Sequence, residues 1–197
     1  MSQLAAINKK ISNLPANQKQ EILDLLAELD EAKEKENSRS DFLTFVNRMW
    51  PSFIAGRHHS IMADAFERVA NGALKRLIVN MPPRHTKSEF ASYLFPAWFL
   101  GKYPEKKIIQ TAHTAELAVG FGRKVRNLIN QDDFQQVFPG ISLSSDSKAA
   151  GRWNTNKRGD YFAIGVGGAV TGKGADVLII DDPHAAQEAA LGAYNPA

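Results

Sequence analysis

Lys87 and Ser88 are the pair of side chains in this sequence best suited to bind a phosphorylated ligand. They follow an apolar run at 77–79 and a short loop that begins with two prolines, and the residues after Ser88 have a helical pattern. Strand, tight loop, Lys-Ser and helix together form a phosphate-binding loop, in which backbone N–H groups and the helix N-terminus face the anion. In that role Lys87 would reach the β- and γ-phosphates and Ser88 would hold Mg²⁺.

The loop departs from the pattern G-x-x-x-x-G-K-[ST], because Met81 and Thr86 stand where glycines are expected. The segment 167–174 fits the glycine spacing better, but Gly174 has no hydroxyl for a metal and a strand pattern follows it. We therefore expect 165–174 to be a tight β-turn close to another backbone segment. The predicted nucleotide-binding loop residues are Pro82, Pro83, Arg84, His85, Thr86, Lys87 and Ser88.

Two carboxylates, Asp181 and Asp182, directly follow the apolar run 177–180. A buried strand that ends in two acids is typical of a Walker B motif, and it delivers them to the edge of the sheet where a phosphate loop also lies. Asp181 would bind Mg²⁺ through water, and Asp182 would orient or deprotonate the attacking water. The alternative is that this acidic pair only caps a following helix.

Hydrolysis also needs a cation to neutralise charge on the γ-phosphate in the transition state. Arg84 can supply it from within the loop, and Lys173 and Arg152 are candidates to reach a neighbouring subunit's site. Each could equally be a solvated surface cation. Arg57 and His58 lie just upstream of the first predicted strand, where many nucleotide motors hold the adenine.

His58 and its neighbour His59 could also be considered as metal ligands. No further ligands accompany them at a suitable spacing, so we expect ordinary polar or stacking roles for both.

The composition excludes several classes of protein. The 197 residues contain no cysteine, which rules out disulfide scaffolds, thiolate zinc sites and cysteine nucleophiles and fits a reducing cytosol. No apolar run approaches the roughly 18 residues of a membrane span, and the N-terminus lacks a signal-peptide core. A net charge of +3 and a pI near 9.1 permit contact with nucleic acid.

The periodicity predicts an alternation of helices and strands, and hence an α/β fold with a mostly parallel sheet and helices on both faces. Pro96 is expected to kink the fourth helix or to end it early. The predicted helices cover 15–36, 42–49, 60–70, 88–100 and 114–130. The predicted strands cover 74–81, 106–112, 161–170 and 175–183.

Two regions are predicted along the chain: a helical N-terminal segment with a linker at 1–40, and an α/β domain at 41–197. Residues 31–40 are polar and form either that linker or a solvated helix end. The helix at 15–36 has an apolar stripe at 22, 25, 26 and 29. It either docks a partner or folds back onto the chain's own core.

The segments 76–89 (RLIVNMPPRHTKSE), 116–129 and 172–184 (GKGADVLIIDDPH) resemble the ATPase domain of large terminase subunits, the motors that package DNA into tailed-phage heads. The resemblance covers roughly residues 40–190. It implies an ASCE-type P-loop NTPase fold, a three-layer α/β/α sandwich, with ATP and Mg²⁺ as ligands. A loop built on Pro82 and Pro83 is typical of this family.

The resemblance also implies roles for individual residues. Lys87 and Ser88 match the residues that bind phosphate and Mg²⁺, and Arg84 matches the loop arginine. Asp181 and Asp182 match the Walker B acid and the catalytic carboxylate. Lys173 stands where the family usually has an arginine that acts on a neighbouring subunit, and it keeps the charge but loses the planar fork.

The function implied is an ATP-hydrolysing motor that drives double-stranded DNA into the procapsid in the host cytoplasm. Its implied partners are DNA, the portal protein and the small terminase subunit, with a homo-oligomeric ring on the portal and no membrane. Because the sequence stops soon after Asp182, we expect a truncated ATPase domain without the family's nuclease domain. The alternatives are an interaction module with little turnover and a helicase-type ATPase.

Overall fold

The computed structural model describes residues 14–145 and 149–184 of the chain. It divides into two compact units, 1–37 and 38–197, which are described separately. In the first, the described residues belong mainly to helix α2 (Ala16–Ser40), whose last residues enter the second unit. The helix extends through 31–40, so of the two alternatives for this stretch the structure has the helix end. The tails 1–13 and 185–197 of the two predicted regions lie outside the described residues.

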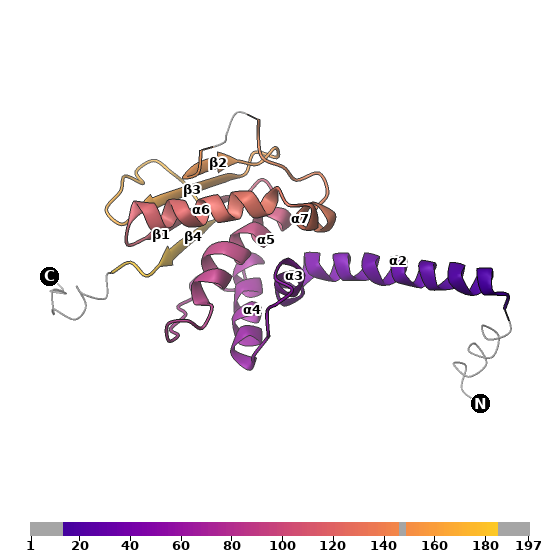
Figure 1. Ribbon diagram of the computed structural model, residues 1–197. Coiled ribbons are helices and arrows are strands. Elements are labelled where there is room, and N and C mark those ends of the chain that lie inside the picture. The colour runs from indigo at the N-terminus through magenta and orange to yellow at the C-terminus, as the bar shows by residue number, and fades with distance from the viewer. Residues whose placement is uncertain (1–13, 146–148, 185–197) are drawn as a thin grey trace. The chain divides into compact units, whose positions relative to one another are not determined.

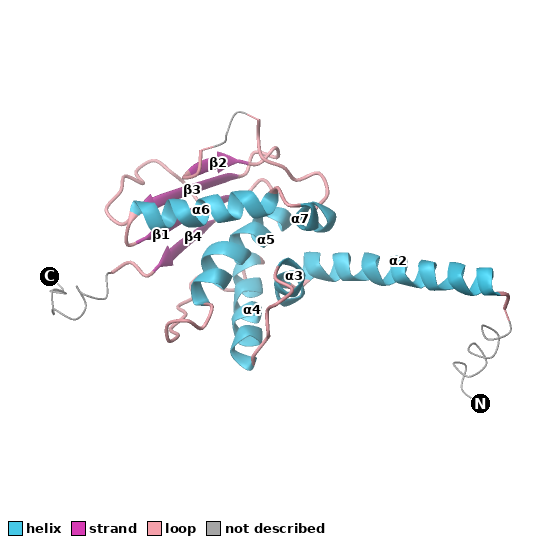
Figure 2. Ribbon diagram, viewed as in Figure 1, coloured by secondary structure: helices cyan, strands magenta, loops and turns pink. Residues whose placement is uncertain are grey.

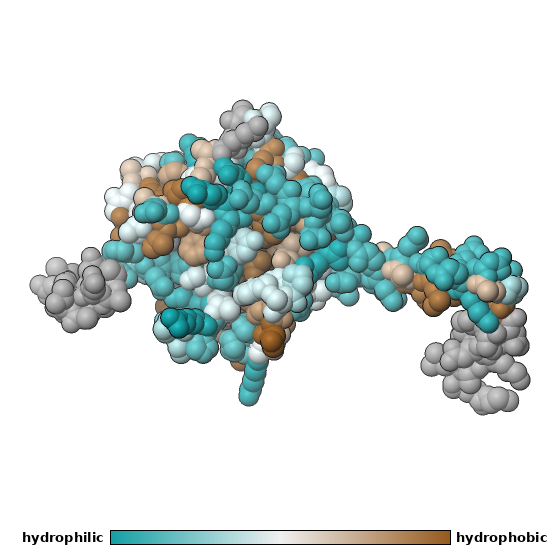
Figure 3. All heavy atoms as spheres, viewed as in Figure 1, coloured by the Kyte–Doolittle hydropathy of each residue, from teal (hydrophilic) through white to brown (hydrophobic). Residues whose placement is uncertain are grey.

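Helix α2 carries four leucines at its surface. Leu23, Leu25, Leu26 and Leu29 are between 48% and 59% exposed, and apolar atoms are visible along this helix in Figure 3. Within residues 14–145 and 149–184, no helix combines the length and the apolar character needed to cross a membrane.

The second unit is built on a four-stranded sheet with the order β2-β3-β1-β4 (Figure 2). The strands are β1 (Lys107–Ala112), β2 (Arg152–Asn154), β3 (Asp160–Gly165) and β4 (Val177–Asp181). Strand β1 pairs in parallel with both β3 and β4, and β2 pairs antiparallel with β3. The predicted mixed α/β fold with a mostly parallel sheet is therefore confirmed.

One face of this sheet is buried under helix α6 (Ala115–Ile129), which packs against β1 and β3 (Figure 1). The side chains on that face are buried: Ile108, Gln110, Tyr161, Ala163, Val177 and Ile179. On the other face, Leu178 and Ile180 are 59% and 57% exposed. The expectation of helices on both faces is therefore wrong for β4 in the described part of the chain, because an apolar run indicates that a strand can be buried but does not provide its cover.

Three further helices of this unit pack through aromatic rings. They are α3 (Phe42–Met49), α4 (Arg57–Ala70) and the short α7 (Asp132–Val137). Phe42 of α3 meets Phe66, Phe90 and Phe95 edge to face, with ring centroids 5.7–5.9 Å apart. The predicted N-cap of α3 is confirmed, since the Asp41 carboxylate accepts a bond of 2.6 Å from the Thr44 N–H.

Residues 74–81 are not a strand, contrary to the prediction. Their alternation is kept: Leu77, Val79 and Met81 pack against the core, whereas Ile78 is 85% exposed. However, β4 pairs only with β1, and no described strand pairs with 74–81. Alternation in a sequence reports which side chains are buried, whereas a strand also needs a neighbouring backbone to bond to.

The helix after the loop runs from Lys87 to Lys102 without ending at Pro96. Its first part, η1 (Glu89–Leu94), is π-helical, and α5 (Phe95–Lys102) continues it. The wider π turn is closed by the Phe95 N–H, which donates to the Phe90 carbonyl. Pro96 has no N–H and would clash with the carbonyl four residues earlier in a regular α-helix. The change of helix type at this point removes that conflict, so the expected early end does not occur.

Candidate phosphate-binding site

The Asp181 carboxylate lies at the end of β4, and two hydroxyls from the helix after the loop hold it there. Ser88 Oγ donates to Asp181 Oδ1 at 3.1 Å, and Ser92 Oγ donates to Oδ2 at 2.8 Å. Asp181 is only 7% exposed. The structure therefore brings together Ser88 and Asp181, the two residues that the sequence predicts as metal ligands.

The second carboxylate, Asp182, forms an ion pair with Lys87. Asp182 has a φ of 40°, which turns the chain sharply after β4. Its side chain is 71% exposed, whereas that of Lys87 is 25% exposed. The lysine and both carboxylates of the predicted constellation thus meet at one end of the sheet, although they are separated by more than ninety positions.

A cavity of about 490 Å³ lies over this cluster. It is formed mainly by the loop itself, with Asp182 from the opposite segment. Its lining residues are Met81, Pro82, Pro83, Arg84, His85, Thr86, Lys87, Ser88, Glu89 and Asp182. All seven predicted loop residues therefore line one hollow, which has about the volume of a small-molecule site.

The loop reaches its shape through two residues in the left-handed region of backbone space. Arg84 and Thr86 have φ values of 63° and 62°. The helix begins directly afterwards, and the Phe90 N–H donates to the Thr86 carbonyl at 3.0 Å. The N-terminus of this helix, with its unpaired N–H groups, therefore faces the loop and suits an anion.

A group of imidazole rings joins the start of α4 to this loop. His58 and His59 have ring centroids 3.8 Å apart, and the His58 ring is 6.1 Å from that of His85. His59 Nε2 lies 2.7 Å from Thr86 Oγ1. The predicted base-binding segment with Arg57 and His58 is therefore adjacent to the predicted phosphate loop. His59 has a polar and stacking role, as expected.

Two cations predicted to act on a neighbouring subunit lie outside the cavity lining. Lys173 places its Nζ 3.3 Å from the centroid of the Phe162 ring. The Arg152 guanidinium is 3.7 Å from the Asp160 carboxylate. Neither position tests a role across a subunit boundary, which stays a prediction.

The glycine-rich segment 165–174 forms turns and leads into β4, as its sequence predicts. A Cβ atom on Gly165 would lie 2.6 Å from the Ala115 backbone nitrogen, which confirms the expected close approach to another backbone segment. No helix follows Lys173 within the described residues up to 184, so the structure gives this segment no helix N-terminus to offer a phosphate.

Ser92 is a residue of the site that the sequence analysis missed. It lies four positions after Ser88 and therefore on the same face of a helix, which is a signal that the spacing alone could have given.

An ion pair near the loop joins α6 to η1: Lys124 lies 2.9 Å from the Glu89 carboxylate. Lys124 of α6 is thus engaged within the domain.

The donor set at Ser88 and Asp181 fits Mg²⁺. This ion prefers oxygen ligands and commonly takes only one or two from protein, with water and phosphate completing its shell. In the described part of the chain, no group of three or more His, Asp or Glu side chains is arranged to hold a metal. A hydroxyl and a carboxylate beside a phosphate loop would suit an ion that arrives with a nucleotide.

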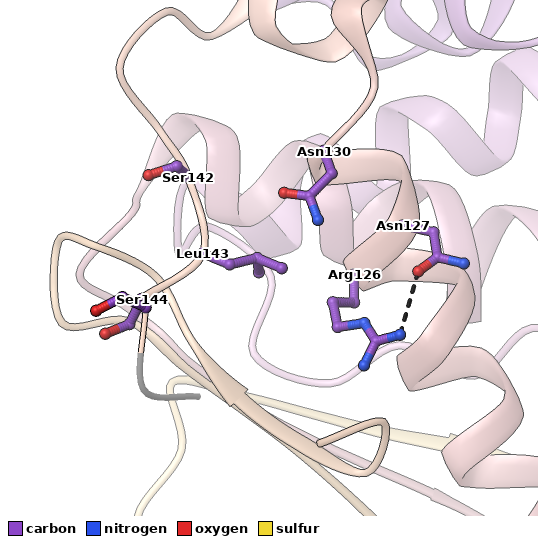
Figure 4. Close-up of a pocket in the computed structure, with 7 residues that line it drawn as sticks. Arg126, Asn127, Asn130, Ser142, Leu143 and Ser144 are labelled. Carbon is purple, nitrogen blue, oxygen red and sulfur yellow. Dashed lines mark hydrogen bonds between the residues drawn. The ribbon is translucent and has the colours of Figure 1, made fainter. Parts of the chain in front are cut away.

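A second cavity, of about 670 Å³, lies away from this site (Figure 4). It lies between the end of α6 and the segment 142–145, and its polar lining includes Arg126, Asn127 and Asn130. The Arg126 guanidinium donates to the Asn127 side chain at 3.4 Å. None of the predicted site residues lines it.

Comparisons of the chain with protein-family models, with curated proteins and with solved structures gave no match.

Proposed function

We propose that this chain binds and hydrolyses a nucleoside triphosphate, with ATP as the expected substrate and Mg²⁺ as its companion ion. The observation that carries the proposal is that Lys87, Ser88 and Asp182 line one cavity, while Ser88 also donates a hydrogen bond to Asp181. Structural ion pairs are common, but here a lysine, a hydroxyl and two carboxylates meet beside a helix N-terminus. That combination supports phosphate binding and water activation in one place.

Each side chain has a defined role in this proposal. Ser88 and Asp181 would hold Mg²⁺, which when bound neutralises charge on the phosphate oxygens. Lys87 would transfer its ion pair from Asp182 to the phosphates. Asp182 would then be free to accept a hydrogen bond from the attacking water and to orient it. Arg84 would approach the γ-phosphate from the loop, and Arg57 and His58 would contact the base.

The wider proposal is that the chain is the ATPase part of a DNA-packaging motor of the terminase type, with a P-loop NTPase fold. It rests on the resemblance of the loop and of the β4 segment to that family. The parallel sheet, with the loop and Asp181 at one end, is compatible with it. In that setting DNA, the portal protein and the small terminase subunit would be partners, and the chain would work as a ring in the host cytoplasm.

A second candidate function is an interaction module that turns over little nucleotide. The exposed leucines of α2 favour it, because a half-exposed apolar stripe on a charged helix suits docking. The first candidate would hydrolyse ATP at a sustained rate, whereas the second would bind a partner and hydrolyse little ATP.

Binding of a fluorescent ATP analogue, titrated with and without Mg²⁺, tests the proposal at its first step. We expect saturable binding that Mg²⁺ strengthens. Lys87→Ala should weaken it by about tenfold or more, because a charge-assisted contact to phosphate is lost. Ser88→Ala should reduce the strengthening by Mg²⁺. Lys157→Ala, which removes an exposed lysine outside the cavity lining, should bind as the wild type does. Equal affinity of the wild type and Lys87→Ala would contradict the proposal.

A further inference from the structure

Thr86 has a backbone conformation that its side chain disfavours. Its φ of 62° lies in the left-handed region, where a β-branched residue is a genuine outlier. The phosphate-loop pattern has glycine at this position, and glycine adopts such a φ without cost. The surrounding structure must therefore stabilise residue 86 in a conformation that threonine would otherwise leave.

A chain of three hydrogen bonds runs from the Gly56 N–H through His59 and Thr86 to the His85 carbonyl. The Gly56 N–H donates to His59 Nδ1 at 2.8 Å, so Nδ1 carries the lone pair and the proton lies on Nε2. His59 Nε2–H can then donate to Thr86 Oγ1 at 2.7 Å. The Thr86 hydroxyl in turn donates to the His85 carbonyl at 2.6 Å. Each group has one consistent role, and a single imidazole tautomer satisfies all three bonds.

The His59 ring is itself firmly positioned. It is 6% exposed and packs against Phe53 edge to face and against Phe90 in a stacked arrangement, with ring centroids 4.6 Å and 5.1 Å away. Phe90 belongs to the helix that follows the loop, so the ring contacts the start of α4 and both sides of the loop–helix junction. A ring packed in this aromatic cluster can restrict the position of the hydroxyl that it bonds.

We propose that His59 is a positioning residue of the phosphate loop: its bond to the Thr86 hydroxyl holds residue 86 in the left-handed conformation that the loop requires. The pair His59–Thr86 thus replaces the glycine of the usual pattern. Without His59, threonine would relax toward negative φ and turn the neighbouring backbone N–H groups away from the phosphate. This inference rests on the proposed nucleotide binding.

Four proteins in a double-mutant cycle test the pair: the wild type, His59→Phe, Thr86→Gly and the double variant. Phenylalanine keeps a ring against Phe53 and Phe90 but forms neither hydrogen bond. With Thr86 present, His59→Phe should weaken binding of the ATP analogue by about tenfold, as expected when a strained residue loses its support. In the Thr86→Gly background, the same change should weaken it by less than about twofold, because glycine needs no support.

A comparison at position 86 alone needs no change at His59. Thr86→Ala keeps the Cβ atom but has no hydroxyl, so it should bind the analogue about tenfold more weakly than Thr86→Gly. Thr86→Ser, which keeps the hydroxyl, should restore most of the affinity that Thr86→Ala loses. His59→Gln, whose amide can both accept from Gly56 and donate to Thr86, should likewise bind more tightly than His59→Phe.

The outcomes separate this inference from the proposed function. Equal losses from His59→Phe in the wild-type and Thr86→Gly backgrounds, or equal affinities of Thr86→Ala and Thr86→Gly, would overturn the pairing. A wild type that binds no nucleotide would overturn the proposed function. Long-range ¹H–¹⁵N NMR of the ligand-free wild type tests the pairing without nucleotide, because it should report the Nε2–H tautomer of His59. The Nδ1–H tautomer would overturn the hydrogen-bond chain.

Discussion

At the residue scale, the site depends on groups that hold one another in place. Asp181 is buried and accepts one hydrogen bond on each oxygen, from Ser88 and from Ser92. An unsatisfied buried carboxylate would be costly, so Ser92 keeps one oxygen satisfied if Ser88 turns to a metal. The ion pair of Lys87 with Asp182 is more exposed and therefore easier to exchange for a phosphate.

His59 gives a prediction about pH at the same scale. Burial, and to a smaller extent electrostatic repulsion from His58 and His85, lowers the pKa of His59 below its ordinary value of 6.5. Between that lowered pKa and pH 6.5 the unfolded chain binds a proton that the folded chain resists. The contribution of neutral His59 to stability is therefore fully present above pH 6.5 and is lost as the pH falls through the folded pKa.

Urea unfolding of the wild type and of His59→Gln, from about pH 7.5 to about pH 5.5, measures this contribution. The wild type should lose stability relative to the variant on acidification, by at most about 1.4 kcal/mol per pH unit for one proton. If the free energies of unfolding of the two proteins changed in parallel with pH, the lowered pKa of His59 would be contradicted. An NMR titration of the His59 ring in the wild type provides the same answer without a substitution.

At the element scale, the strand β3 and the helix α6 approach each other through glycine. A Cβ atom on Gly165 would lie 2.6 Å from the Ala115 nitrogen at the start of α6. Gly165→Ala should therefore lower the free energy of unfolding by about 1–3 kcal/mol, as overpacking usually does. Gly120 provides the matched control, since a Cβ atom there meets nothing within 4 Å.

Because Gly120 lies within α6, Gly120→Ala should stabilise the protein slightly, by about 0.5–1 kcal/mol, through better helix propensity. Urea unfolding of both variants checks the pair. Equal changes in the free energy of unfolding for the two substitutions would contradict a steric conflict at Gly165.

Some elements could be predicted from the sequence, and others could not. Local signals in the sequence sufficed for the cap at Asp41, for β1 and β4, and for the helix that follows the loop 82–86. The strand predicted at 74–81 does not form, because a strand needs a partner backbone and the local sequence does not report one. The early helix end predicted at Pro96 does not occur, because a π-helical turn accommodates this proline. The bond between His59 and Thr86 joins residues 27 positions apart, which no periodicity in the sequence reports.

At the scale of the whole molecule, one sheet edge collects side chains from two distant segments. The loop–helix unit supplies the lysine and the hydroxyl, and β4 supplies the two carboxylates. In a mostly parallel sheet, strands that run in the same direction end at the same edge, so β4 must deliver Asp181 and Asp182 there. We propose that this convergence serves hydrolysis and is not only structural.

Steady-state release of phosphate from ATP by the purified chain, with Mg²⁺, tests that claim most directly. We expect hydrolysis that falls by about 100-fold or more in Lys87→Ala. In Asp182→Asn it should fall by a similar factor while the analogue still binds, since the acid that orients water is lost. Asp64→Asn, an exposed acid on α4, should leave the rate unchanged. No release above background at high protein concentration, or equal release by the wild type and Lys87→Ala, would contradict it.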